Sequence, residues 1–248
     1  DGSLFPVEIG LNPMDVDGVP HVLATIVDVT QRKADRALLE RAVADKTALL
    51  REVHHRVKNN LQVISSLLSL QSRQLLGDAR AALDESRSRV QAMALIHQLL
   101  YERDDFTSAT LAPYLARLCA LLADSHGRRG ILPVLVLGPG GEQVVLDVER
   151  AVPCGLLVNE LVTNALKHAG RDRSSGRVEV LLQGGAEGRA LLRVSDDGPG
   201  LPDGVRPGST ATLGFQLVPL LAEQLAATLT VGEGPGASFD IDFPIGRL

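Results

Sequence analysis

The chain has 248 residues, of which 45% are hydrophobic and 22% are charged, and its formal net charge is −5. This length supports one large domain or two modest ones, each with its own core. The mild acidity and the absence of basic runs argue against a nucleic-acid partner. No hydrophobic run approaches the roughly 20 residues that cross a bilayer, so we expect no membrane segment in this chain. The two cysteines, Cys119 and Cys154, lack His or Cys neighbours at metal-ligand spacing, which argues against a zinc site or disulfide framework and favours a reducing cytoplasm.

Residues 4–29 alternate in the manner of β-strands, with turn residues at Asn12-Pro13 and Asp17-Gly18. Two or three strands do not form a stable domain alone, so we expect residues 1–30 to be the end of a larger domain. The first residues contain neither an initiator Met nor the pattern of a signal peptide, and we expect the natural chain to extend upstream.

The next segment, from Gln31 to about Gln74, has a helical pattern with Thr30 as the candidate N-cap. Its apolar seam has heptad spacing and comprises Leu50, Val53, Val57, Ile64 and Leu67. Gly77-Asp78 ends this helix, and a second helix is expected over 79–101. We divide the region into a helical linker, 31–48, and an antiparallel hairpin, 49–104. A second copy would cover the open faces of the hairpin and complete a four-helix bundle.

The remaining segment, 105–248, interleaves helices with strands, which predicts an α/β or α+β layered domain. The expected helices are 111–123, 147–169 and 213–225. The expected strands are 131–137, 178–183, 189–195, 227–231 and 238–243.

The first hairpin helix carries a polar stripe in which His55, Asn59 and Gln62 follow helical spacing. A neutral imidazole on an exposed helix face is a competent nucleophile near pH 7. The alternative is a solvated face that happens to carry histidines. His97 fits the apolar seam of the second helix and is expected to be a packed histidine.

A second polar stripe lies on the helix 153–169, where Glu160, Asn164 and the pair Lys167-His168 share a face. A carboxylate, an amide oxygen and a lysine in this arrangement can hold Mg²⁺ and phosphates, since Mg²⁺ prefers oxygen ligands and retains several waters.

Three glycines follow the second stripe, and each lies where a ligand can approach the backbone. Gly198 and Gly200 come after Asp196, whose carboxylate can accept a hydrogen bond from an exocyclic amine. Gly214 opens a helix whose N-terminal amides suit a phosphate. Each glycine taken singly is equally compatible with an ordinary turn.

Together these motifs resemble a known family. Asn159–His168, Asp196–Gly200 and Leu213–Gly214 resemble, in this order, the ATP-binding boxes of the gyrase/Hsp90/histidine-kinase/MutL superfamily. His55–Leu61 resembles the phosphoacceptor box of the HWE-like subgroup of two-component sensor histidine kinases, and residues 1–30 resemble the last strands of a PAS sensor domain. The resemblance implies an α+β chain, in which a dimeric four-helix bundle precedes an α/β-sandwich ATP-binding domain, 105–248.

The resemblance also implies an activity: autophosphorylation of His55 from Mg²⁺-ATP, then transfer to an aspartate of a response regulator, in a cytoplasmic homodimer. His54 is the less favoured acceptor. The commoner members of the family carry an acidic residue directly after the phosphorylated histidine, whereas Arg56 stands here. The group that takes the imidazole proton therefore stays open between Glu160 and Glu52.

For the nucleotide, the resemblance implies that Asn164 ligates Mg²⁺, that Lys167 and His168 contact phosphates, and that Asp196 binds the adenine amine. Gly198, Gly200 and Gly214 would frame the pocket. Two alternatives stay open: an ATP-dependent serine kinase or clamp of the same superfamily, and a non-catalytic dimeric scaffold.

Overall fold

The computed structural model describes residues 4–102, 108–126, 131–168, 176–185, 187–202, 204–208, 213–232 and 236–246, together with Gly2 and Gly234. The chain divides into two compact units, Asp1–Glu52 and Val53–Leu248. No helix among the described residues is long and apolar enough to span a membrane.

The first unit contains a hairpin of two antiparallel strands, β1 (Val7–Val16) and β2 (Val19–Asp28). The predicted turn at Asp17-Gly18 is present, and both of its residues have positive φ. The second predicted break, at Asn12-Pro13, is wrong, because both residues pair with β2 inside β1. A proline is tolerated there because each strand of a two-stranded sheet has a free edge toward which its nitrogen can face.

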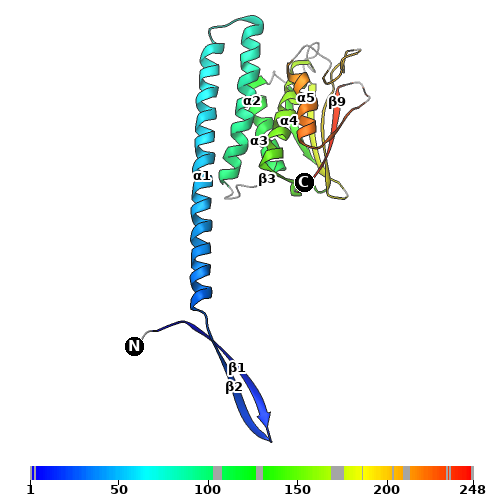
Figure 1. Ribbon diagram of the computed structural model, residues 1–248. Helices are drawn as coiled ribbons and strands as arrows, with labels where there is room; N and C mark the ends of the chain where they lie inside the picture. Colours follow the sequence, from blue (N-terminus) through cyan, green and yellow to red (C-terminus); the bar gives the residue numbers. More distant parts are fainter. Residues whose placement is uncertain are drawn as a thin grey trace. The chain divides into compact units, whose positions relative to one another are not determined.

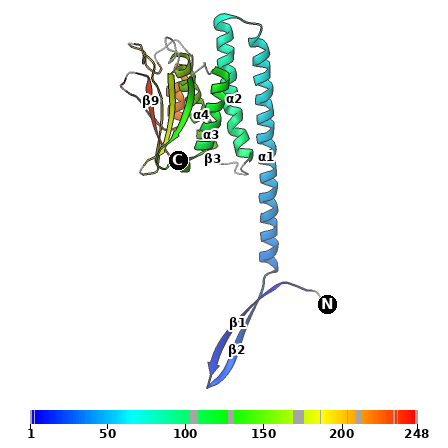
Figure 2. The ribbon, with the colours of Figure 1, turned by 180° about the vertical axis from the view of Figure 1, so that it is seen from behind.

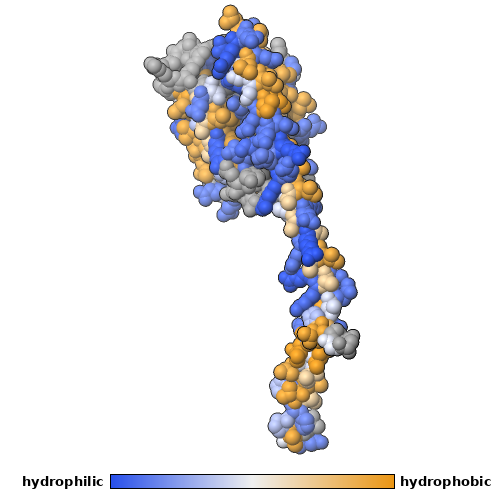
Figure 3. All heavy atoms as spheres, turned by 90° about the vertical axis from the view of Figure 1, so that its left-hand side faces the viewer, coloured by the Kyte–Doolittle hydropathy of each residue, from blue (hydrophilic) through white to orange (hydrophobic). Residues whose placement is uncertain are grey.

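Hydrophobic side chains of this hairpin are uncovered. Every residue of β2 is exposed, and Ile9 and Leu11 of β1 are exposed as well. Figure 3 shows mostly hydrophobic atoms over the two strands. A two-stranded sheet with apolar side chains in solvent is marginal by itself.

Two long helices follow, α1 (Thr30–Ser72) and α2 (Gly77–Glu102). The Asp28 carboxylate accepts hydrogen bonds from the backbone N–H of Thr30 at 2.8 Å and from its hydroxyl at 2.6 Å, so Asp28, rather than Thr30, caps the start of α1. Gly77 has φ +60°, which lets the chain turn sharply between the helices.

The hairpin helices contact each other through a face that coincides only in part with the predicted seam. Val53, Ile64 and Leu67 of that seam are exposed, whereas its residue Val57 is partly buried together with Leu61. Burial against a single neighbouring helix therefore leaves an apolar stripe of α1 in solvent.

The C-terminal part of the second unit is built on a mixed five-stranded sheet in the order β4-β6-β7-β9-β8. β4 and β6 are parallel, and the other neighbours are antiparallel. The strands are β4 (Ile131–Leu137), β6 (Gly176–Gly184), β7 (Arg189–Asp196), β8 (Thr228–Val231) and β9 (Ser238–Pro244). Two features were not predicted from the sequence: the short two-stranded sheet of β3 (Ser108–Thr110) and β5 (Val145–Asp147), and the 3₁₀ turn η1 (Gly141–Gln143).

Three helices cover one face of this sheet: α3 (Leu111–His126), α4 (Val148–His168) and α5 (Leu213–Gln224). Figures 1 and 2 show this two-layer arrangement from opposite sides. Alternate residues of β6, β7 and β9 are buried, as expected for strands with one covered face. Polar residues such as Arg193 and Asp240, which form an ion pair across β7 and β9, lie on the opposite face.

Helix α2 contributes to the same core. Ala92 and Ile96 are fully buried together with residues of α3 and α4. The Tyr114 hydroxyl of α3 donates a hydrogen bond to the carbonyl of Ala92 at 3.2 Å. Gly155 of α4 makes this approach feasible, since a Cβ at this position would lie 1.7 Å from the Tyr114 oxygen. Helices α2, α3 and α4 therefore share one hydrophobic core.

Candidate functional site

A pocket of about 290 Å³ opens between α4, the ends of β7 and β9, the segment after β7 and the start of α5. Most of its lining is apolar, and the polar side chains are Asn164, His168 and Asp196. The remaining lining residues are Leu161, Ala165, Val194, Pro199, Gly200, Leu201, Pro202, Val205, Phe215, Ala237 and Phe239. An apolar cleft with a few polar groups suits an organic ligand with a flat ring and a charged tail.

Asp196 is fixed by the backbone at the end of β7. Its carboxylate accepts hydrogen bonds from the N–H of Gly198 at 2.8 Å and from that of Ala237 at 3.4 Å. Burial raises the pKa of Asp196, and these two donors partly offset that rise. Gly236 permits the close contact, because a Cβ there would lie 1.8 Å from the Asp196 carbonyl oxygen. One oxygen of the carboxylate is thus oriented while the group still lines the pocket.

The other polar residues of the pocket come from the last turns of α4. Asn164 and His168 are four residues apart, so they lie one above the other on the helix and both line the cavity. Buried residues Leu157 and Leu161 anchor the same helix in the core. Gly200 has φ +79°, a left-handed conformation that glycine adopts readily, and it brings the backbone to the pocket wall.

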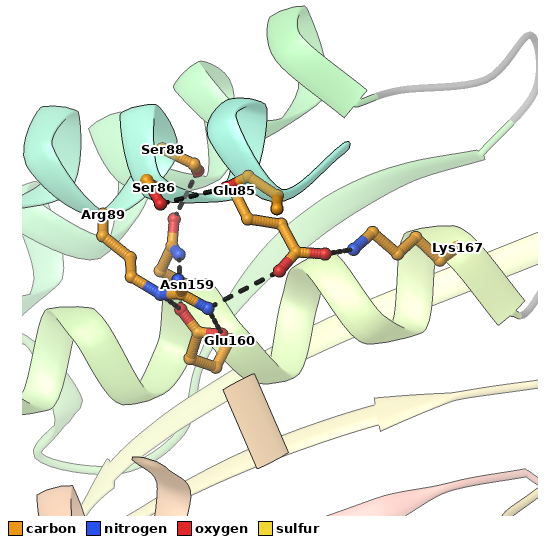
Figure 4. Close-up of polar contacts among 8 residues, drawn as sticks. Glu85, Ser86, Ser88, Arg89, Asn159, Glu160 and Lys167 are labelled. Atoms are coloured by element: carbon orange, nitrogen blue, oxygen red, sulfur yellow. Dashed lines mark hydrogen bonds and ion pairs between the residues drawn. The ribbon is translucent and has the colours of Figure 1, made fainter. Parts of the chain in front are cut away.

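The other two residues of the predicted α4 stripe face α2 rather than the pocket. Arg89 donates from Nε and Nη2 to the two Glu160 oxygens at 2.7 and 2.8 Å, and Lys167 forms an ion pair with Glu85. Figure 4 shows both pairs between the two helices. The stripe is therefore divided: Asn164 and His168 line the pocket, whereas Glu160 and Lys167 contact the hairpin.

Gly214 lies at the first turn of α5, directly beside Glu160. A Cβ at Gly214 would approach Glu160 Oε2 to 2.3 Å, so a larger residue at this position would displace the Glu160 carboxylate. The nearby Gly198 is buried and supplies the N–H that binds Asp196. The resemblance to the ATP-binding family implies a lid over residues 201–212, and part of that segment falls outside the described residues.

The two neighbouring histidines of α1 have different surroundings. His55 is exposed, and its Nδ1 is 3.3 Å from Asn59 Nδ2, as the predicted spacing requires. His54 is partly buried, with its Nδ1 3.0 Å from Nδ1 of His97 on α2. Burial lowers the pKa of both histidines, and the nearby His54 lowers the pKa of His97 further. His97 is thus packed between the helices, as a hydrogen-bonded residue outside the fully apolar core.

Two aromatic residues of the pocket were missed by sequence reasoning. Phe215 and Phe239 line it, with ring centroids 5.9 Å apart and an interplanar angle of 82°. Phe215 directly follows Gly214, and Phe239 belongs to the alternating apolar pattern of β9, so both carried a local signal. The α2 residues that contact Glu160 and Lys167 carried no local signal, because an ion pair between distant segments leaves no pattern of spacing in the sequence.

Family comparisons agree with this geometry. Residues 52–126 match the family described as histidine kinase, and residues 150–247 match the family described as histidine kinase-, DNA gyrase B-, and HSP90-like ATPase. The chain therefore belongs to the histidine kinases and carries their ATP-binding domain.

Among individual relatives, the chain is 36% identical over 228 residues to the sensor histidine kinase PdtaS of Mycolicibacterium smegmatis, covering 90% of this chain and 44% of the relative. It is 35% identical to blue-light-activated histidine kinase 2 of Erythrobacter litoralis, covering 80% and 57%. The solved histidine kinase domain of a blue-light-activated kinase from Erythrobacter litoralis is 28% identical, with a TM-score of 0.59 over 81% of this chain and 94% of that domain. The chain thus spans less than two thirds of these two curated relatives.

Proposed function

We propose that this chain is the core of a sensor histidine kinase that transfers the γ-phosphate of Mg²⁺-ATP to His55 and then to an aspartate of a response regulator. The observation that supports this most strongly is the pocket: the Asp196 carboxylate, the Asn164 amide and the His168 imidazole line one apolar cavity in a domain of the ATP-binding family.

The adenine ring would lie in the apolar part of the pocket. Asp196 accepts two backbone N–H bonds and would accept a further one from the exocyclic amine, which gives the site a preference for adenine. Val194 and Phe239 supply apolar surface beside it. Gly198 holds the carboxylate through its N–H, and Gly200, which lines the pocket with φ +79°, allows the ligand to approach the backbone. Gly214 would frame the pocket from the first turn of α5.

The phosphates would lie toward Asn164 and His168. The Asn164 amide oxygen is a hard ligand of the kind that Mg²⁺ prefers, and phosphate oxygens and water would fill the other positions. Among the described residues no group of three or more His, Cys, Asp or Glu side chains is placed to hold a metal ion. A single protein ligand fits an ion that arrives with its nucleotide and neutralises the phosphate charge during transfer.

His55 is the proposed acceptor because it is exposed, whereas the neighbouring His54 is partly buried against His97. Glu160 and Glu52 are the candidates for taking the imidazole proton. Lys167, with His168, would bind phosphate once it is released from Glu85.

The remaining proposals concern assembly. We place the hairpin in a homodimeric four-helix bundle, because the stripe that includes Val53, Ile64 and Leu67 is exposed in a single chain. The uncovered β1–β2 hairpin supports its assignment to the end of a PAS domain. We propose that these parts act together in the cytoplasm, in a kinase that passes its phosphate to a response regulator.

The proposal is tested by labelling the chain with γ-labelled ATP and Mg²⁺, then comparing His55→Ala with His54→Ala. We expect acid-labile label on wild type and His54→Ala, a loss of at least about 100-fold on His55→Ala, and similar nucleotide affinity in all three. Label that persists in His55→Ala would assign the acceptor elsewhere. Acid-stable phosphoserine on a partner, or phosphate release without a phosphoenzyme, would favour the serine kinase or clamp, and no nucleotide binding would favour a scaffold.

A further inference from the structure

The polar contacts between α2 and α4 form one connected cluster. Arg89 binds both oxygens of Glu160, and its Nη2 also lies 3.7 Å from Glu85 Oε2. Glu85 in turn pairs with Lys167. Ser88 donates a hydrogen bond to Asn159 Oδ1 at 2.7 Å, and Asn159 Nδ2 donates to Glu160 Oε1 at 3.2 Å. Figure 4 shows that the cluster joins one face of α2 to one face of α4.

This cluster is largely removed from solvent at its centre. The side chains of Arg89 and Glu160 are only 12% and 7% exposed, and Ser88 and Asn159 are buried. Ion pairs in such surroundings are weakly screened by salt, and separating the partners would leave a buried charge without compensation. The contact is therefore geometrically defined, unlike the exposed ion pairs of α1 such as Arg36–Glu40.

The contacts engage two α4 groups that the proposed reaction needs. A carboxylate whose two oxygens both accept from a guanidinium is poorly placed to take a proton from an imidazole, and Glu160 is in this state. Lys167, a proposed phosphate ligand, is paired with Glu85. The residues that line the nucleotide pocket all come from the chain after α3, so the pocket is open to ligand while these two groups are held by the hairpin.

We propose that Glu85, Ser88 and Arg89 form a latch on α2 that holds the ATP-binding domain in a resting state, in which nucleotide can bind but Glu160 and Lys167 are withheld from the transfer. This inference rests on the proposed kinase function. The latch is an equilibrium between two arrangements, so weakening it raises the population that can transfer phosphate without altering the pocket.

The activity test compares Arg89→Gln with Arg193→Gln. The first substitution retains an amide donor but removes the charge and the paired bonds to Glu160. Arg193 makes a similar paired contact with Asp240, at 2.5 and 2.6 Å, on the uncovered face of the sheet, so its variant is a matched control. We expect Arg89→Gln to raise the initial rate of His55 labelling about three- to tenfold at unchanged nucleotide affinity, and Arg193→Gln to match wild type. Ser88→Ala, which changes no charge, should raise the rate in the same direction.

A second test reports the latched state without using activity. A water-soluble carbodiimide activates a carboxylate and couples it to an amine in contact, forming an amide while the carbodiimide takes up the water as a urea. Glu85 and Lys167 are in contact, so wild type should form this cross-link, detected by mass spectrometry of the digested protein. The yield should fall in Arg89→Gln and stay constant in Arg193→Gln.

The outcomes separate the latch from the proposed function. The absence of a Glu85–Lys167 cross-link in wild type would overturn the latch. An Arg89→Gln variant that is labelled at the wild-type rate would overturn it as well. Slower labelling of that variant would also do so, because Arg89 would then position Glu160 for the reaction. If the Arg89 variant does not fold, the Ser88→Ala rate decides in the same way. A different result is that neither wild type nor any variant is labelled, while the cross-link forms and its yield falls in Arg89→Gln. The kinase proposal then fails. The contact between α2 and α4 would be a structural contact only, and the proposal that it regulates phosphate transfer would be overturned.

Discussion

Replacement of Asp196 by Asn should separate the stability of the protein from its affinity for nucleotide. Asn has nearly the same shape, and its Oδ1 can keep the bond from the Gly198 N–H, which is 2.8 Å long in wild type. The other carboxylate oxygen becomes an NH₂ donor. Asp196 would accept a hydrogen bond from the adenine amine. In the variant, the NH₂ group of Asn would face that amine, and two donors cannot form a hydrogen bond with each other.

Losing a hydrogen bond to a charged acceptor costs about 1.5–3 kcal/mol, which corresponds to an affinity for ATP about 10- to 150-fold weaker. The free energy of unfolding should not fall in parallel. Burial raises the pKa of Asp196, so the ionised form is disfavoured in the folded protein. A carboxyl group with a raised pKa in the folded protein stabilises the fold at pH values below its pKa in the unfolded chain, and this stabilisation is lost as the pH rises through its pKa in the folded protein. At a pH above both pKa values, the neutral amide of Asn is therefore better tolerated than the ionised carboxylate. We expect the variant to be as stable as wild type, or more stable by less than about 1 kcal/mol.

The assay is calorimetric titration with ATP and Mg²⁺ alongside urea unfolding, at a pH near neutrality. Asp197→Asn is the matched control, because Asp197 is the adjacent carboxylate, accepts a bond from the Arg177 N–H, and is not among the residues that line the pocket. Unchanged affinity in Asp196→Asn, or an equal loss in both variants, would refute the role of Asp196 in adenine binding.

Two further changes test the packing of the helices. Gly155→Ala should lower the free energy of unfolding by about 1–3 kcal/mol, because its Cβ would lie 1.7 Å from the Tyr114 oxygen. Urea unfolding measures this loss, and adding Tyr114→Phe should recover part of it; a Gly155→Ala protein as stable as wild type would contradict the contact. His97→Gln should reduce the loss of stability on acidification. Burial lowers the pKa of His54 and His97 below the ordinary value of 6.5, so the unfolded chain binds more protons than the folded one and wild-type stability decreases as the pH falls from 6.5 toward the folded values. Urea unfolding at a series of pH values should show that the free energy of unfolding falls less steeply with acidification in the variant than in wild type. The same pH dependence in both proteins would exclude the histidine pair as the cause of the acid sensitivity.

The helices and strands of the ATP-binding domain follow from local pattern. Strand β4 occupies the predicted residues, and α4 (Val148–His168) lies within the predicted helix 147–169, because apolar periodicity and flanking glycines mark such elements clearly. The three-residue strands β3 and β5 are too short to show periodicity, and only their pairing in the folded chain defines them. The seam of α1 was located by its heptad spacing, but spacing does not determine which neighbour covers it.

The candidate site was predictable in part for the same reason. Asn164, His168 and Asp196 line one pocket, since helix spacing and strand ends determine where such side chains lie. Glu160 and Lys167 share the helix with Asn164, yet they contact Arg89 and Glu85 across more than 70 residues of sequence. Ion pairing between distant segments has no local signature, so it becomes visible only in the folded chain.

The burial of α2 residues beside α3 and α4 limits how Glu160 can be released. Ala92 and Ile96 are fully buried, and Tyr114 binds the backbone of α2. Complete separation of the helices would transfer these apolar side chains to water, whereas a sliding displacement along α2 would exchange one set of apolar neighbours for another. We therefore expect α4 to slide against α2 during activation. The apolar contacts between the helices would stay shielded from water, and only the polar contacts of Glu85, Ser88 and Arg89 with α4 would break and form again.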